Sequence, residues 1–199
     1  MRMSPAKHLS LVDPILGAVI SQIKIDENRK PNKNHFRSLV ESIVSQQLSV
    51  KASDTIFARF VELFVKSGAI KTARSFPKPD QILKMSDARL RKVGLSGSKV
   101  KYIKDLSHKV HEKEVQLNRL HKMNDEEVIE HLVQVKGIGR WTGEMFLMFS
   151  LARPDIFSHG DLGLRNAIKK LYGFKEDPTT KQIEKIIANT TNKPITRLA

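Results

Sequence analysis

Apolar residues recur every three or four positions in almost every segment of the sequence, which is the spacing of one face of an α-helix. Five groups of residues carry such stripes: Ile15, Leu16, Val19, Ile20 and Ile23; Phe36, Leu39, Val40, Ile43 and Val44; Ile56, Phe57, Phe60, Val61 and Phe64; Val100, Ile103, Leu106 and Val110; Ile183, Ile186 and Ile187. No segment alternates convincingly at period two, as a half-buried strand would. The pattern predicts an all-α protein of about nine helices in one or two lobes.

Capping residues mark the starts of several of these helices. Asp13 and Asp177 each precede a proline, a pair that commonly opens a helix. Asn124 is followed three residues later by Glu127, which is the pattern of a capping box. Only short connectors separate the periodic segments, so we expect a compact helical chain without a long linker.

The charge balance favours a polyanionic partner. Lysine and arginine number 35 against 21 acidic residues, a net charge of +14; nucleic acid suits this best, although a basic surface also suits a membrane face or solubility. The chain has no cysteine, which excludes disulfides, Cys-ligated zinc and a Cys-held iron–sulfur cluster. The opening residues lack the apolar core of a signal peptide and no apolar run reaches membrane-spanning length, so we expect an intracellular protein.

The stretch VKGIGRWTGEMF (135–146) indicates a very tight turn between two helices. We expect the first helix to end at Lys136 and Gly137 and the second to begin at about Trp141. Gly137 and Gly139 permit positive φ and a close approach of another backbone. The N-terminal amides of the second helix would then form an anion site. A plain helical hairpin with a glycine turn is the alternative interpretation.

This stretch resembles the helix-hairpin-helix (HhH) of the DNA glycosylases that share the motif, and two further segments resemble the same family in the same order. SQQLS (45–49) resembles its wedge turn, and Asp161 matches its essential aspartate. The best match is the 3-methyladenine DNA glycosylase II type of the HhH-GPD superfamily. The resemblance implies a two-lobed helical fold with the active-site cleft between the lobes. We expect one lobe to comprise 36–152 and the other to comprise 1–35 with 153–199.

The resemblance assigns the grip on DNA phosphate to the hairpin and to the segment GLSGSK. The implied phosphate-binding residues are Lys136, Gly137, Gly139, Arg140, Thr142 and Lys99. It also implies that the main-chain carbonyls of Val133, Val135 and Ile138 hold a monovalent cation, Na⁺ or K⁺, when DNA is bound. No other cofactor is implied. His108 and His111 lack an acidic or cysteine partner that would complete a metal site.

The same resemblance assigns the residues that would handle the damaged base. Gln47 and Leu48 would wedge into the gap left by an extruded nucleotide, although an exposed helix break is the alternative. Trp141 and Met145 would line the base pocket, where a tryptophan face favours a cationic alkylated purine. A core tryptophan is the alternative for Trp141, and a family tyrosine often stands at Met145. Relatives that also cleave the strand carry a lysine at position 141, and tryptophan cannot form their Schiff base.

Asp161 would be the catalytic residue, stabilising the oxocarbenium-like sugar or orienting water. A simple helix N-cap is the alternative for Asp161, and the two roles are compatible; Asp155 is the competing carboxylate. The final residues, KPITRLA, resemble the family's Pro-x-Arg-Ser-x-Ala segment, but the Trp-rich helix that usually follows it is not present. We expect either a truncated chain or a more open pocket.

Taken with the resemblance, the sequence predicts a monofunctional DNA glycosylase of base excision repair. It would flip out 3-methyladenine or 7-methylguanine and hydrolyse the N-glycosidic bond, leaving an abasic site. We expect a monomer that acts on double-stranded DNA with a damaged base, away from membranes, in the nucleoid, cytoplasm or nucleus. The alternatives are a non-catalytic or degenerate helix-hairpin-helix DNA-binding protein, and a glycosylase for deaminated or oxidised bases.

Overall fold

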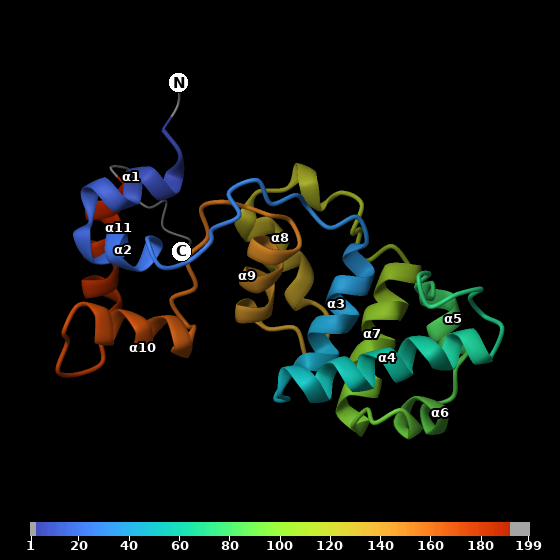
Figure 1. The fold of residues 1–199 in the computed structure, drawn as a ribbon. Coiled ribbons are helices and arrows are strands. Elements are labelled where there is room, and N and C mark those ends of the chain that lie inside the picture. The colour runs from blue at the N-terminus through green and yellow to red at the C-terminus, as the bar shows by residue number, and fades with distance from the viewer. Residues whose placement is uncertain (1–2, 192–199) are drawn as a thin grey trace. The chain divides into compact units, whose positions relative to one another are not determined.

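The computed structural model describes residues 3–191, and every regular element in that range is helical (Figure 1). The elements are α1 (Pro5–Val12), α2 (Pro14–Ile20), α3 (His35–Ser45), α4 (Val50–Lys66), α5 (Pro79–Lys84), α6 (Asp87–Lys92), α7 (Gly97–His111), η1 (Leu120–Lys122), α8 (Asp125–Val133), α9 (Arg140–Phe149), α10 (Leu162–Leu171) and α11 (Thr180–Thr191). The all-α prediction is confirmed. The helices outnumber the expectation because α5 and α6 have six residues each, too few to show a periodic stripe.

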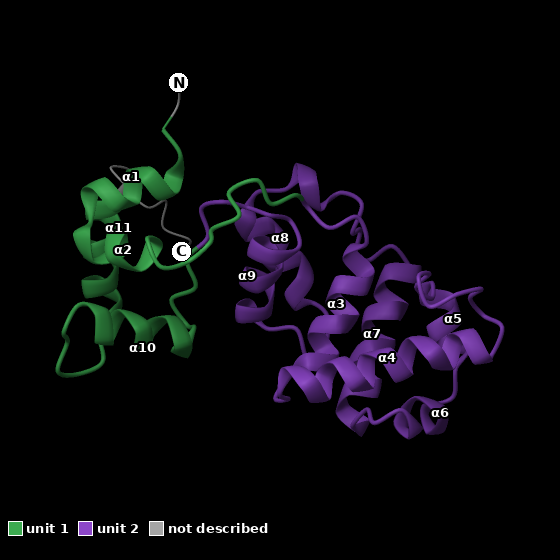
Figure 2. Ribbon diagram, viewed as in Figure 1, with its two compact units in different colours: residues 1–30, 157–199 green, residues 31–156 purple. Residues whose placement is uncertain are grey.

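The chain divides into two compact units, coloured separately in Figure 2. Unit 1 comprises residues 1–30 and 157–199, and unit 2 comprises residues 31–156. The expected bounds of 36–152 are too narrow for unit 2, because both of its ends are bonded to it. The Asn32 amide donates to the Ser150 carbonyl (2.8 Å), and the Arg153 guanidinium donates to the Met123 carbonyl (2.8 Å).

Unit 2 is built around α3, which packs against α4, α7 and α9 (Figure 1). The apolar stripe predicted for this segment is its buried face, since Leu39, Val40, Ile43 and Val44 have no exposed surface. The core continues through the phenylalanines of α4 into α7 and α8. Because α3 runs through this core, its C-terminal end emerges at a fixed place on the surface of unit 2.

Unit 1 contains α1, α2, α10 and α11. Asp13 caps α2 as predicted, since its Oδ1 accepts hydrogen bonds from the Ile15 and Leu16 amides. Its Oδ2 accepts a hydrogen bond from the Tyr172 hydroxyl (2.6 Å), which ties the start of the chain to the end of α10. Burial and this bond raise the pKa of Tyr172.

The last helix begins later than predicted. It starts at Thr180 rather than just after Asp177, because Thr179 and Gln182 bond to each other across its first turn. Asp177 instead pairs with Lys169 (2.7 Å). The segment KPITRLA lies outside the described residues.

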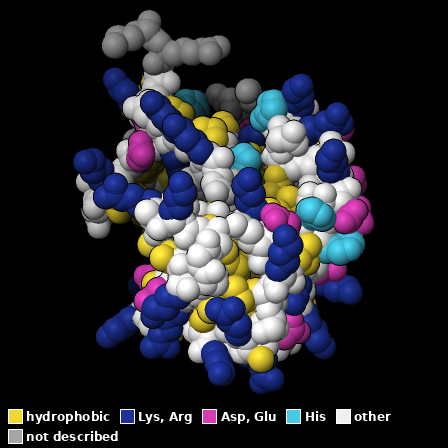
Figure 3. Space-filling model, turned by 90° about the vertical axis from the view of Figure 1, so that its right-hand side faces the viewer, with side chains coloured by type: hydrophobic (Ala, Val, Ile, Leu, Met, Phe, Trp, Pro, Cys, Tyr) yellow, Lys and Arg dark blue, Asp and Glu magenta, His cyan; other side chains and the backbone are white. Residues whose placement is uncertain are grey.

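Lys and Arg side chains are scattered over the face drawn in Figure 3, with fewer Asp and Glu side chains among them. Among residues 3–191, no helix combines the length and the hydropathy that a membrane span requires. The same residues hold no cluster of three His, Asp or Glu side chains suited to a metal ion. His108 and His111 are exposed, as expected.

Candidate functional site

The connector of the hairpin between α8 and α9 is longer than predicted, because α8 ends early. Helix α8 begins with the predicted Asn124–Glu127 capping box but ends at Val133, three residues before Lys136. The chain then turns through a hydrogen bond from the Ile138 amide to the Val135 carbonyl (3.0 Å). The side chains of both turn residues are buried, so they anchor the turn to the core of unit 2.

Gly137 is the residue that the turn requires to be glycine. Its φ is +81°, and a Cβ built there would lie 2.5 Å from Cγ of the Tyr102 ring. Gly139 does not use the positive φ that glycine permits, since its φ is −97°, and an added Cβ would meet nothing within 4 Å. The fold itself does not require glycine at 139, so the open space there suits the approach of a ligand.

The start of α9 presents uncapped amides next to this open space. Gly139 is the N-cap, and no side-chain cap bonds to the first turn of α9. First-turn amides at the positive end of a ten-residue helix are a common anion site. These amides are the groups that the predicted phosphate grip would use.

Two side chains predicted to bind phosphate are engaged elsewhere. The Arg140 guanidinium donates two hydrogen bonds to Glu126 (2.7 and 2.8 Å), lies 3.3 Å from Glu144, and has its pKa raised by the bond to Glu126. Thr142 is buried. Both residues therefore offer their amides rather than their side chains. The Lys136 side chain is 75% exposed, and its ammonium forms a long ion pair with Asp105 (3.9 Å).

Lys99 is also not a free phosphate ligand. Its ammonium donates to the carbonyls of Val44 (2.8 Å) and Gln46 (2.7 Å) at the end of α3. Burial among these groups lowers the pKa of Lys99. The predicted surface contact is therefore an internal one, because the side chain folds back over the core instead of extending into solvent.

The predicted wedge residues stand at the tip of an exposed turn between α3 and α4. Gln47 is exposed and has a φ of +56°, a strained value for a residue with a side chain. Leu48 beside it is 39% exposed. Gln46, which we did not single out, donates from its side chain to the Gly137 carbonyl (2.8 Å) and so links this turn to the hairpin.

Trp141 and Met145 lie one helical turn apart on the same face of α9. Trp141 is 48% exposed, so it is not a core residue of unit 2, and the alternative of a core tryptophan is wrong there. Met145 is half-buried, and Phe149 extends the same apolar face by another turn with 49% exposure. The helix therefore presents an exposed stripe of large apolar side chains that begins at its uncapped end.

Asp161 is the N-cap of α10, as predicted: its Oδ1 accepts a hydrogen bond from the Leu164 amide (2.8 Å). A Cβ at Gly163 would lie 3.2 Å from that Oδ1, so glycine leaves space beside the carboxylate. Asp161 belongs to unit 1, whereas the hairpin and the wedge turn belong to unit 2. The competing carboxylate, Asp155, is exposed in unit 2.

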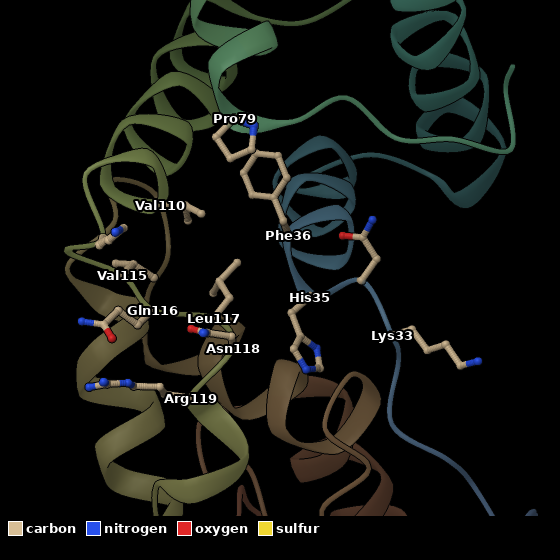
Figure 4. Close-up of a pocket in the computed structure, with 12 residues that line it drawn as sticks. Lys33, His35, Phe36, Pro79, Val110, Val115, Gln116, Leu117, Asn118 and Arg119 are labelled. Atoms are coloured by element: carbon tan, nitrogen blue, oxygen red, sulfur yellow. The ribbon is translucent and has the colours of Figure 1, made fainter. Parts of the chain in front are cut away.

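A separate cavity of about 550 Å³ opens in unit 2, and none of the predicted site residues lines it. Its walls come from the start of α3, the end of α7 and the segment after α7 (Figure 4). Lys33, Lys113 and Arg119 make its rim basic, and burial lowers the pKa of His35.

Unit 2 is helical, and the second helix of its hairpin has no side-chain N-cap. In a chain of net charge +14, this arrangement is typical of a helix-hairpin-helix protein of the DNA-binding class. Comparison with known families narrows this class. The sequence model of the "HhH-GPD superfamily base excision DNA repair protein" matches residues 40–193. The chain belongs to the HhH-GPD superfamily.

Individual relatives agree with this assignment. DNA-3-methyladenine glycosylase 1 of Schizosaccharomyces pombe is 33% identical over 169 residues, which cover 82% of this chain and 71% of that protein. A crystal structure of a DNA-3-methyladenine glycosidase from Bacillus halodurans has a TM-score of 0.77 at 35% identity, covering 98% of this chain and 87% of the other. The Schizosaccharomyces pombe 3-methyladenine DNA glycosylase (Mag1) in complex with abasic DNA has a TM-score of 0.78 at 30% identity, covering 95% and 90%. Other relatives are longer, and the chain spans 49% and 60% of two of them.

Several residues that shape the site escaped sequence reasoning. Tyr102 packs under Gly137, Asp105 accepts a hydrogen bond from the Lys136 amide (2.9 Å), and Glu126 holds Arg140. Each of these residues lies between 14 and 35 positions from the hairpin residue that it contacts. The segments that contain them show only helical spacing, so no local pattern predicts the contacts. Gln46 lies inside the SQQLS stretch, but its bond to the Gly137 carbonyl spans 91 positions and was not predicted either.

Proposed function

We propose that the chain is a monofunctional DNA glycosylase that excises alkylated purines, 3-methyladenine and 7-methylguanine, and leaves an abasic site. The observation that carries this proposal is Asp161, a carboxylate fixed in direction at the head of α10 in a member of a base excision repair family. The names of the similar proteins, which are glycosylases or glycosidases of DNA-3-methyladenine, support the choice of substrate.

The hairpin binds one phosphate of the damaged strand. The amides at the start of α9 donate to the phosphate oxygens, and the open space at Gly139 allows the backbone to approach closely. The exposed Lys136 adds a charge contact. Since the side chains of Arg140, Thr142 and Lys99 are engaged or buried, specificity for phosphate rests mainly on the main chain.

The carbonyls of Val133, Val135 and Ile138 would hold a monovalent cation beside this contact when DNA is bound. The carbonyls of Val133, Val135 and Ile138 lie within one short turn, and neutral main-chain oxygens suit Na⁺ or K⁺. The Val135 carbonyl accepts one hydrogen bond, from Ile138, and retains a second lone pair. The residues present therefore fit the ion, which would supply positive charge to the phosphate.

Extrusion of the damaged nucleotide depends on the wedge turn. Gln47 and Leu48 fill the gap in the stack, which offsets the few kcal/mol that unstacking costs. Trp141 then offers its exposed face to the extruded base, with Met145 beside it. A tryptophan face attracts a cationic base by about 1–2 kcal/mol, and this attraction favours alkylated purines over normal ones.

Hydrolysis requires little from the protein beyond Asp161. The carboxylate stabilises the positive charge that develops on the sugar, or orients the attacking water. An alkylated purine already carries a positive charge and leaves without a strong general acid. Because position 141 is tryptophan rather than lysine, no Schiff base forms and the strand stays intact.

The partner is double-stranded DNA with a damaged base, bound by a monomer where the DNA resides, with no further cofactor. The positive surface and the uncapped hairpin support this partner, and the binding should weaken steeply with salt.

The test is release of free base from methylated duplex DNA by wild type, Asp161→Asn and Asp155→Asn. Asparagine caps a helix as well as aspartate does, so Asp161→Asn removes the charge and keeps α10. We expect it to lose at least about 100-fold in rate with DNA binding intact, while the exposed Asp155→Asn control retains activity. Salt-sensitive binding without release by wild type would instead support a non-catalytic protein, and release confined to deaminated or oxidised bases would change the substrate.

A further inference from the structure

We propose that Lys99 and Gln46 together hold the wedge turn (residues 46–49) against the hairpin turn (135–139), and so set the rate of base extrusion without contacting DNA. The inference rests on the proposed function, because it concerns the wedge of that same site. We call these contacts the Lys99–Gln46 link. Through this link, both side chains position the wedge turn and do not themselves touch DNA.

The first half of the link fixes the end of α3. The last carbonyls of a helix have no partners within the helix. Here the carbonyls of Val44 and Gln46 accept hydrogen bonds of 2.8 and 2.7 Å from the Lys99 ammonium. A charged donor makes these bonds stronger than neutral ones. Lys99 is itself held at the start of α7, where its amide donates to Ser96 Oγ (3.2 Å).

The second half of the link reaches the hairpin. The Gln46 side chain donates to the Gly137 carbonyl (2.8 Å), across 91 positions of sequence. Gly137 rests over the ring of Tyr102, and the amide of the neighbouring Lys136 donates to Asp105. The hairpin turn is therefore supported from the same helix as the wedge turn.

One face of α7 thus carries both turns. Lys99, Tyr102 and Asp105 are spaced three residues apart, which places them along one side of the helix. Lys99 supports the wedge turn, and the other two support the hairpin turn. Because α7 is anchored by the buried Val100 and Ile103, the two turns share a rigid base.

The conformation of the wedge shows why such support is needed. Gln47 has a φ of +56°, and a strained residue keeps such a conformation only where its surroundings impose it. The turn has one hydrogen bond of its own across its tip, from the Leu48 amide to the Ser45 carbonyl (3.1 Å). Without the link, the turn would relax and the exposed Gln47 and Leu48 would lose their fixed direction.

The test compares Lys99→Met with Lys101→Met on two DNA substrates. Lys101 is exposed and lies on the opposite face of α7, so its variant removes the same charge and leaves the link intact. Single-turnover base release is measured with the lesion in a matched duplex and in a bulge, where the base is already unstacked. We expect Lys99→Met to slow release about 10- to 100-fold in the matched duplex, the range for losing a charged hydrogen bond.

In the bulge we expect a loss below about threefold, because little unstacking remains to be driven. Lys101→Met should match wild type on both substrates, and Lys99→Arg should recover part of the rate. Equal slowing on both substrates, or an equal effect of Lys101→Met, would overturn the proposal.

Hydrogen exchange without DNA separates this inference from the proposed function. The Leu48 amide should exchange faster in Lys99→Met, and also in Gln46→Ala, which removes the bond to Gly137 and spares the end of α3. Unchanged exchange in both variants would refute the link, even if the wild type releases base. Faster exchange would support it even if the wild type releases none, and in that case the proposed function alone would fail.

Discussion

Substituting alanine for Gly137 should damage both the stability of unit 2 and its grip on DNA. The new Cβ would lie 2.5 Å from Cγ of the Tyr102 ring, well inside van der Waals contact. The backbone must also keep a φ of +81°. The left-handed conformation costs about 1–2 kcal/mol for a residue with a side chain. Displacing the ring adds about 1–3 kcal/mol, as overpacking does elsewhere.

Urea unfolding followed by circular dichroism should therefore show a loss of about 2–5 kcal/mol for Gly137→Ala. Gly139→Ala is the matched control, since its φ is −97° and its Cβ would meet nothing within 4 Å. Alanine is a poorer N-cap than glycine, so the control should lose about 1 kcal/mol, less than Gly137→Ala. It should still weaken binding to duplex DNA, because the methyl group occupies the open space before the α9 amides.

A double mutant separates the two causes. In a Tyr102→Ala background the ring is absent, so Gly137→Ala should cost only the backbone term of about 1–2 kcal/mol. The same loss in both backgrounds would show that Tyr102 does not enforce glycine at 137. A Gly137→Ala variant as stable as wild type would refute the whole account of the turn.

Three further predictions concern single side chains. Tyr172→Phe should destabilise unit 1 by about 1–2 kcal/mol. Burial of Asp13 opposes its ionisation, but its hydrogen bonds with Tyr172 and two amides lower the pKa of its carboxyl. The stability that ionised Asp13 contributes to unit 1 is therefore full above pH 3.8 and is lost as the pH falls further. A wild-type advantage that persists unchanged below that pH in acid unfolding would contradict this. Glu126→Gln should raise affinity for DNA in a salt-titrated anisotropy assay, since it frees Arg140 from its bidentate partner; unchanged affinity would show that Arg140 stays with Glu144. Trp141→Leu should slow 7-methylguanine release about tenfold, the value of a desolvated cation–π contact, and equal slowing for an uncharged base such as hypoxanthine would argue against that contact.

The helices and their caps could be predicted because they depend on local sequence. The stripe from Leu39 to Val44 is the buried face of α3, and Asp13, Asn124 and Asp161 each cap the helix that follows. Those signals lie within four residues of the feature that they specify. The end of α8 was placed too late, because the turn is closed by a hydrogen bond between Val135 and Ile138 rather than by glycine alone.

The roles of charged side chains could not be predicted in the same way. Lys99 and Arg140 looked like phosphate ligands, since a cation near a phosphate-binding turn usually is one. Their partners are carbonyls 53 to 55 positions away and a carboxylate 14 positions away, and only the fold brings these groups together. Gly139, where glycine permits a positive φ, has a φ of −97°, whereas Gln47, which has a side chain, has a φ of +56°.

The central claim is that this chain hydrolyses the glycosidic bond and leaves the strand whole. The most direct test is the mass of the products when excess wild-type protein meets a duplex that carries one 7-methylguanine. The account predicts free 7-methylguanine and a full-length strand that has lost the base and gained one water, with no strand break before alkali is added. A cleaved strand, or an intact substrate despite saturated binding, would contradict it.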